Sequence, residues 1–110
     1  MIEKIVLDYL SEALDYPVYL EHQEVDEYVM IEKTGSGFED QISSATLAIQ
    51  SHARSMLRAI EINQEVKEAM KSIIILDDIS SVRLNSDYNF TDTETKHYRY
   101  QAVYDLTFYE

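Results

Sequence analysis

The amino-acid sequence predicts an α+β fold: a single domain, residues 1–110, with an antiparallel β-sheet of about four or five strands and two α-helices packed on one face. Apolar residues recur at helical spacing in two separate stretches, and β-forming residues or regular alternation fill most of the rest. A chain of 110 residues is long enough for one hydrophobic core and too short for two domains. It contains no repeat, low-complexity tract or linker.

The two helices are predicted from apolar residues three and four apart. The first begins at Ile2, runs for about fourteen residues and should end at residues 15–17, because the residue before Pro17 disfavours the helical region. The second begins near His52, and its apolar stripe consists of Met56, Ala59, Ile60, Ile62, Val66, Ala69, Met70 and Ile73. Residues 73–76 are all apolar, and they fit either the end of this helix or an extended segment.

The strands are predicted from β-forming residues and alternation. We expect them at residues 18–21, 27–33, about 42–51, 80–87 and 98–109. Gly35 and Gly37 predict a turn after the second strand, within a long polar connection, residues 34–41, whose tip we expect to be mobile. A second polar loop is expected at residues 87–96.

The last predicted strand alternates most regularly and has one aromatic face. That face consists of Tyr98, Tyr100, Ala102, Tyr104, Leu106 and Phe108. We interpret it as the core beneath the two helices. The opposite face, with Val103, Thr107 and Tyr109, has the mixed character of a solvated surface or an assembly surface. Nine tyrosines suit positions where one end of a ring is buried and the other meets water or a partner.

The charge of the chain excludes several function classes. Nine Lys and Arg against 21 Asp and Glu give a formal charge of −12, which argues against an autonomous nucleic-acid binder and against docking on an anionic membrane. No apolar run approaches the roughly 18–20 residues of a membrane span, and the N-terminus lacks the apolar core of a signal peptide. Without cysteine there is no disulfide framework and no thiolate zinc site.

No motif predicts catalysis, a cofactor or a metal. We interpret His22 beside Glu21 and Glu24 as structural, because such neighbours are common in an acidic chain. His52 is expected at a strand-to-helix junction as a capping or solvated residue, and His97 at the start of the last strand. The chain has no H-E-x-x-H pattern, no G-x-S-x-G elbow and no phosphate-binding glycine loop. We therefore expect a non-enzymatic protein without cofactor or metal.

The order of motifs along nearly the whole chain resembles a known family. An amphipathic helix precedes Pro-Val-Tyr (17–19), Tyr-Val-Met-Ile-Glu-Lys-Thr-Gly (28–35), an acidic loop, Ala-Thr-Leu-Ala-Ile-Gln-Ser-His-Ala (45–53), a helix and Tyr-Gln-Ala-Val-Tyr-Asp-Leu-Thr-Phe (100–108). This arrangement is similar to the tail terminator, or tail-to-head joining, proteins of long-tailed bacteriophages and prophages, which are often labelled minor capsid or tail-component proteins.

The resemblance implies a structural protein of virion assembly that closes the head-proximal end of the tail tube. It implies a homo-oligomer, a six-subunit (hexameric) ring, with the tail tube protein and the head–tail connector as partners. It places the protein in the virion tail, or in the cytoplasm of the infected or lysogenic bacterium. The family has no catalytic residues to carry over.

Candidate assembly residues come from the polar connection and from the open side of the last strand. They are Gly35, Gly37, Phe38, Glu39, Asp40, Val103, Thr107 and Tyr109. We expect the connection to become ordered on contact with the tube or a neighbouring subunit. If Glu39, Asp40 and residues 87–94 face the bore of the ring, their charge would repel DNA from the wall and let it pass without binding.

Two alternatives are open. The first is a head completion or tail tube subunit of the same phage. The second is a small acidic cytoplasmic interaction module such as a DNA mimic, although the predicted helix faces mix Glu with Lys and Arg, which disfavours regular rows of carboxylates.

Overall fold

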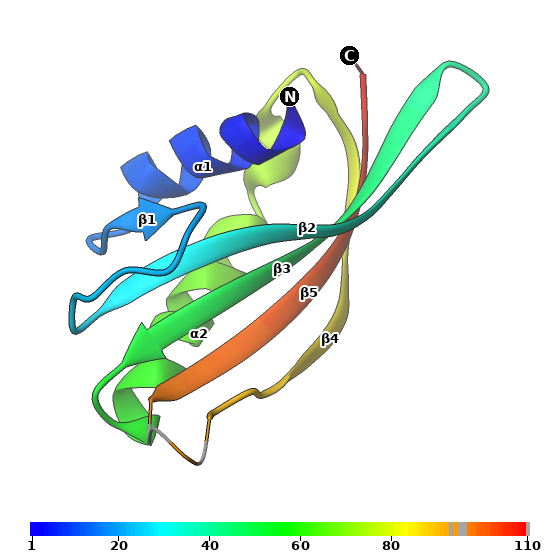
Figure 1. The fold of residues 1–110 in the computed structure, drawn as a ribbon. Helices are drawn as coiled ribbons and strands as arrows, with labels where there is room; N and C mark the ends of the chain where they lie inside the picture. Colours follow the sequence, from blue (N-terminus) through cyan, green and yellow to red (C-terminus); the bar gives the residue numbers. More distant parts are fainter. Residues whose placement is uncertain (93, 95–96, 110) are drawn as a thin grey trace.

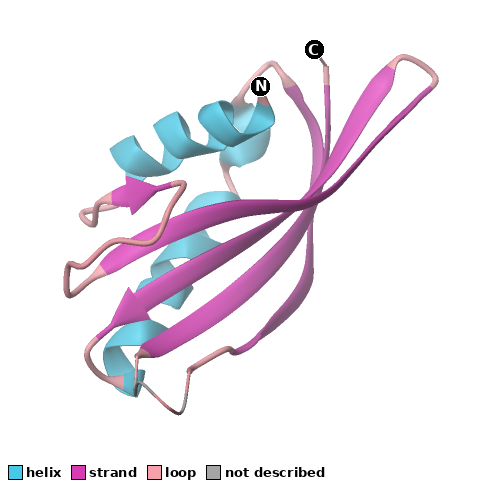
Figure 2. Ribbon diagram, viewed as in Figure 1, coloured by secondary structure: helices cyan, strands magenta, loops and turns pink. Residues whose placement is uncertain are grey.

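A five-stranded β-sheet with two α-helices forms the molecule (Figure 1), which confirms the predicted α+β fold. The computed structural model describes residues 1–92, 94 and 97–109. The elements in chain order are α1 (Ile2–Ala13), β1 (Val18–Tyr19), β2 (Tyr28–Glu39), β3 (Ile42–Ala53), α2 (Met56–Met70), the 3-10 helix η1 (Ile73–Ile75), β4 (Ile79–Asn89) and β5 (Tyr98–Phe108). The strands lie in the order β1-β2-β3-β5-β4 (Figure 2).

The sheet is antiparallel except at one edge. β1 pairs in parallel with β2, through Val18 opposite Val29 and Tyr19 opposite Met30, so the prediction of a fully antiparallel sheet is wrong there. β1 is also shorter than the predicted strand 18–21, because the chain leaves the sheet after Tyr19 and returns through residues 20–27 to the end at which both strands start. The other neighbouring strands pair as predicted, in antiparallel fashion.

The hydrophobic core lies between the helices and one face of the sheet. α1 buries Ile2, Val6 and Leu10, and α2 buries Ala59, Ile62, Val66 and Met70. The sheet contributes alternate side chains, among them Val29, Ile31, Leu47, Ile49, Ala102, Tyr104, Leu106 and Phe108. Four residues of the aromatic face of the last strand are therefore core, as interpreted from the sequence, and Tyr98 is partly buried against it, whereas Tyr100 is half-buried outside the core.

The first helix ends before Pro17 as predicted, but the second starts later than expected. Ser55 is the N-cap of α2, and its Oγ accepts a hydrogen bond of 3.2 Å from the Arg58 backbone N–H. His52 therefore lies in β3, which extends to Ala53, and not at a helix start. Residues 73–75 form a 3-10 turn in which Ile73 is buried, so this segment is neither a continuation of α2 nor extended.

The connection predicted at residues 34–41 is mostly paired strand. β2 runs through Gly35 and Gly37 to Glu39, and the turn is made by Asp40 and Gln41, whose φ angles are 52° and 67°. Positive φ at both central residues is the geometry of a two-residue hairpin turn with the twist of the flanking strands. The predicted glycine turn is therefore wrong. We call residues 34–42 the arm, because this hairpin projects beyond the rest of the molecule (Figure 1).

The loop predicted at residues 87–96 is also smaller than expected. β4 continues to Asn89, and the Phe90 backbone N–H donates to the Arg99 carbonyl at 2.9 Å, which extends the pairing with β5. Residues 93, 95 and 96 of that prediction lie outside the described residues. Among the described residues no helix combines the length and the apolar character needed to cross a membrane.

Candidate functional site

The arm holds five of the predicted assembly residues together. Gly35, Gly37, Phe38, Glu39 and Asp40 all lie on it, and the Phe38 side chain is 73 % exposed. Phe38 is opposite Ser43 and Gly37 is opposite Ser44, so the strand ladder holds the backbone of the arm in place. Between Lys33 and Gly35 the register shifts by one residue, a bulge that bends β2 where the arm begins.

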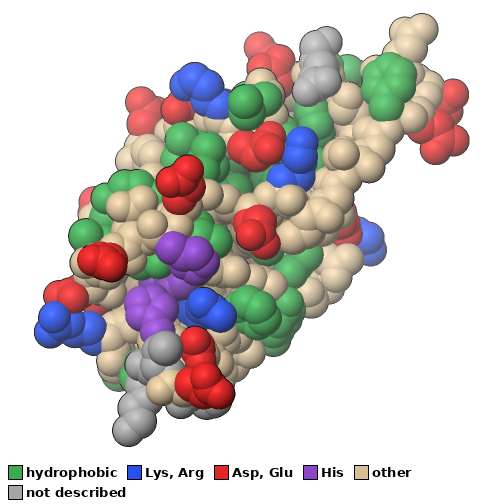
Figure 3. All heavy atoms as spheres, viewed as in Figure 1, with side chains coloured by type: hydrophobic (Ala, Val, Ile, Leu, Met, Phe, Trp, Pro, Cys, Tyr) green, Lys and Arg blue, Asp and Glu red, His purple; other side chains and the backbone are tan. Residues whose placement is uncertain are grey.

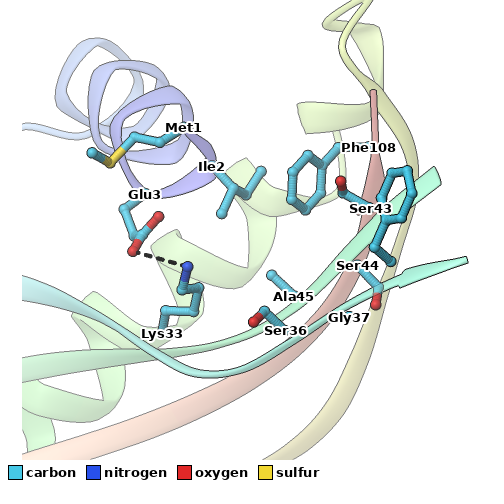
Figure 4. A pocket seen from close by; sticks show the side chains of 11 residues that line it. Met1, Ile2, Glu3, Lys33, Ser36, Gly37, Ser43, Ser44, Ala45 and Phe108 are labelled. Atoms are coloured by element: carbon cyan, nitrogen blue, oxygen red, sulfur yellow. Dashed lines mark ion pairs between the residues drawn. The ribbon is translucent and has the colours of Figure 1, made fainter. Parts of the chain in front are cut away.

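Two hollows lie at the root of the arm, one on each face of the sheet. The first, about 490 Å³, is bounded by the start of α1, the arm and Phe108 (Figure 4). Its apolar lining includes Ile2, Ala45 and Phe108, and an ion pair of 3.5 Å between Glu3 and Lys33 lies beside it (Figure 4). The second, about 640 Å³, is lined by open-face residues such as Thr46, Arg83 and Thr107. The arm therefore presents the exposed phenyl group of Phe38 next to concave surfaces.

The open face of the sheet, which we define as the face turned away from α1 and α2, holds two further predicted residues. Val103 and Thr107 are half-buried there, opposite Ala48 and Ser44 of β3. Thr107 shares the second hollow with Gly35, whereas Val103 does not line it. Tyr109 follows the end of β5 and is 53 % exposed. The predicted residues of the arm and those of the open face thus lie next to one another only at the root of the arm.

Asp105 organises the polar part of the open face between Val103 and Thr107. Its carboxylate accepts hydrogen bonds from Asn85 Nδ2 at 2.9 Å, Thr46 Oγ1 at 2.9 Å and Arg83 Nη2 at 3.0 Å. The bonds from Asn85 and Thr46, followed by the charge of Arg83, hold the pKa of Asp105 below its ordinary value. The carboxylate is therefore ionised at neutral pH and joins three strands.

The three histidines of the chain meet at the other end of the open face, which sequence reasoning did not predict. Figure 3 shows histidine side chains at the surface there. His52, expected to be capping or solvated, is fully buried. Its ring stacks on Tyr28 at 4.3 Å between centroids, and the His22 ring lies edge to face with it at 5.7 Å between centroids. His52 Nδ1 is 2.7 Å from His97 Nε2. We call His22, His52 and His97 the histidine cluster.

A chain of side-chain hydrogen bonds runs from the histidine cluster across three strands. His52 Nε2 is 3.0 Å from Gln50 Oε1, Gln50 Nε2 donates to Gln101 Oε1 at 2.9 Å, and Gln101 Nε2 donates to Tyr88 Oη. Because an amide oxygen only accepts, His52 carries its proton on Nε2. Its bare Nδ1 must then accept from His97 Nε2–H. The chain therefore has one direction, from His97 to Tyr88.

Burial keeps the His52–His97 pair neutral. Desolvation, with smaller contributions from the charges of His97, Arg99 and His22, lowers the pKa of His52 to about 3. Desolvation, followed by the charge of Arg99, also lowers the pKa of His97. Within residues 1–92, 94 and 97–109, no group of three or more His, Asp or Glu side chains is arranged to hold a metal ion. His52 and His97 therefore form a neutral hydrogen-bonded pair.

Seven basic residues of the described part of the chain form local ion pairs, whereas Arg99 donates to the Phe90 carbonyl. Lys33 pairs with Glu3, Arg54 with Asp26 at 2.8 Å, and Arg58 with Glu27 at 2.9 Å. Further pairs involve Lys4, Lys67, Lys71 and Arg83. Since acidic residues outnumber basic ones by 21 to nine, the charge that is left over is negative.

Comparison with known proteins adds nothing to this geometry. No model of a protein family matches the chain, and no curated protein is significantly similar to it. The function is therefore inferred from the surfaces of the molecule itself.

Proposed function

We propose that the protein is a non-enzymatic structural subunit that assembles into a closed ring. The ring is of the kind that terminates a phage tail tube at its head-proximal end and joins it to the head connector. The observation on which the proposal rests is the arm, a paired hairpin that projects from the body and holds Phe38 73 % exposed. Large aromatic side chains of this kind are frequent anchors of protein interfaces.

The arm and its root offer two different surfaces for one interface. A ring needs a heterologous contact, in which one patch of a subunit meets a different patch of the next. The exposed ring of Phe38 is one such patch. Phe38 itself lines the hollow of about 490 Å³, whereas the hollow of about 640 Å³ on the open face is a separate concave patch of suitable size for side chains of a neighbour.

The outer edge of β2 adds a backbone surface to this interface. β1 pairs only with Val29 and Met30, so the described part of the chain places no strand beside residues 31–39 of β2 on that side. An open edge of this length can accept a strand from a neighbouring subunit, and pairing would satisfy its backbone groups. The arm would thereby become part of a sheet that continues from one subunit to the next.

The charge of the chain suits a conduit for DNA. Glu39 and Asp40 are exposed at the end of the arm, while Lys33, Arg54 and Arg58 are each paired with a carboxylate. A ring that turns these acids toward its bore would repel DNA from the wall. The proposal therefore requires a bore whose net potential is negative.

The first experiment measures the mass of the purified protein by light scattering over a range of concentrations. We expect a monomer that converts into a ring of defined size, and we expect Phe38→Ser to weaken this association at least tenfold. Leu57→Ser is the matched control, because Leu57 is 67 % exposed on α2, away from the arm. Equal effects of the two substitutions would contradict the role of the arm.

A second experiment separates the terminator from its alternatives. Added to polymerising tail tube protein, a terminator stops growth and shortens the tubes, and Phe38→Ser loses this effect. Open-ended tubes of the protein alone would instead identify a tube subunit, since a heterologous contact that does not close grows without limit. No effect on tube length would remove the terminator proposal.

A further inference from the structure

The histidine cluster lies outside the proposed ring contacts and joins parts of the chain that are distant in sequence. His22 belongs to the β1–β2 connection, residues 20–27, and His97 directly precedes β5. Both meet His52 of β3, His22 through a ring contact of 5.7 Å and His97 through a hydrogen bond of 2.7 Å. The cluster therefore brings the β1–β2 connection and the residue that precedes β5 together on one central strand.

We propose that the histidine cluster is an acid-sensitive latch: in its neutral form the His52–His97 pair holds His97, which directly precedes β5, against the open face beside the β1–β2 connection, and protonation of the pair releases His97. This inference goes beyond the proposed function and does not depend on ring formation.

The direction of the hydrogen-bond chain determines where protons can enter. A first proton can bind His97 at Nδ1, because Nε2–H still donates to His52. A second proton must go to His52 Nδ1, where it removes the acceptor of that hydrogen bond and places two cations 2.7 Å apart. His52 is fully buried, so water cannot reduce this repulsion.

Charged and titratable groups from every neighbouring element surround the cluster. Arg99 of β5 adds positive charge close to both His52 and His97, whereas Asp92 favours the charged form of His97. Tyr28 of β2 stacks on His52, and its hydroxyl lies 3.5 Å from His22 Nδ1. Glu24, Asp26 and Arg54 line a hollow of about 390 Å³ with His97, and Asp26 is paired with Arg54. Tyr88 ends the hydrogen-bond chain on β4.

The sign of the pH effect follows from proton uptake. In the latched form the pKa of His52 is lowered to about 3, whereas a released histidine has the ordinary value of about 6.5. Above pH 6.5 both forms are neutral, and latching has its full stability. As pH falls below 6.5 the released form binds a proton that the latched form does not bind, so release becomes about tenfold more favourable per pH unit.

Amide hydrogen exchange, corrected for the intrinsic pH dependence of exchange, tests this inference. We expect protection of the Asp92 and Arg99 amides, which donate to the His97 carbonyl and to Thr91 Oγ1, to fall about 30-fold between pH 7.5 and pH 5, the effect of one extra proton. Residues 59–66 of α2 and 104–108 of β5 should keep their protection. The range stops at pH 5 because carboxylates titrate below it.

His52→Gln removes the buried titrating group, and we expect most of the pH dependence to disappear. His22→Gln is the matched control, because His22 contacts His52 without sharing the 2.7 Å hydrogen bond, and it should retain the dependence. Protection in the original protein that is independent of pH, or equal effects of both substitutions, would overturn the latch.

Imidazole nitrogen NMR of the unmodified protein gives a test that does not require a variant to fold. At pH 5.5 we expect His52 to be neutral, with its proton on Nε2. A His52 ring that is charged at pH 5.5 while the Asp92 and Arg99 amides are still protected would overturn the inference.

Discussion

At the scale of single residues, the open face contains a buried polar chain whose members depend on one another. Gln50 and Gln101 are both buried, and each amide uses its oxygen and its nitrogen within the chain from His52 to Tyr88. A buried polar group that loses its partner keeps its full desolvation cost. These glutamines therefore contribute to stability mainly because all of their neighbours are present.

The substitution Gln101→Leu tests this dependence. It leaves Gln50 Nε2 without its acceptor, and we expect a loss of about 1–3 kcal/mol in the free energy of unfolding. Urea denaturation with an unchanged m-value would measure it. Gln64→Leu is the control, because Gln64 is exposed on α2 and should change stability by less than about 0.5 kcal/mol. Equal losses of unfolding free energy in the two variants would show that the buried hydrogen-bond chain contributes no more to stability than a surface glutamine.

At the scale of elements, the arm combines a bend, two glycines and a tight turn. The two glycines have different surroundings. A Cβ added at Gly37 would lie 2.9 Å from Ser44 Oγ, whereas one added at Gly35 would meet Thr46 at an ordinary 3.8 Å. Close approach of the two strands thus explains the glycine at position 37, although neither glycine has a positive φ.

Alanine substitutions at Gly37 and Gly35 should therefore change the stability of the arm in different directions. Gly37→Ala requires Ser44 Oγ to move away from the added Cβ and should destabilise the arm by about 0.5–1.5 kcal/mol. Gly35→Ala should be neutral or slightly stabilising, since alanine loses less backbone entropy than glycine on folding. Exchange of amides in residues 34–44 measures both effects. The double substitution Gly37→Ala with Ser44→Ala should recover the loss, and failure to recover would point to another cause.

At the scale of the whole molecule, charge opposes self-association. Each subunit carries −12, so neighbouring copies in a ring repel one another over the Debye length, about 10 Å at 0.1 M salt and 3 Å at 1 M. The contact at the arm must overcome this repulsion by apolar burial and strand pairing.

Association should accordingly strengthen with salt. Between roughly 0.05 M and 0.5 M NaCl we expect rings to form at lower protein concentration, because repulsion is screened while apolar contacts are not. Sedimentation or light scattering measures the protein concentration at which half of the chains are in rings. Phe38→Ser should stay monomeric over the whole range. Rings that dissociate as salt rises would instead indicate an interface built on charge pairs.

The sequence by itself determined the class of fold, the two helices and the strongly alternating last strand. These features depend on local periodicity, which reports which side of a helix or strand meets a core. The end of α1 before Pro17 is local for the same reason. The arm was recognised as a segment without a place in the core, but its turn was assigned to glycine, whereas Asp40 and Gln41 adopt the positive φ angles.

Only the tertiary structure decided the parallel β1–β2 pairing, the hollows at the root of the arm and the histidine cluster. The register of β2 on β3 brings His52 opposite Tyr28, and the register of β3 on β5 places Gln50 opposite Gln101. One signal was present in the sequence, because Gln50 and His52 alternate along one strand with side chains on the same face. What that face meets depends on pairing between residues up to 51 positions apart. No local pattern contains that information.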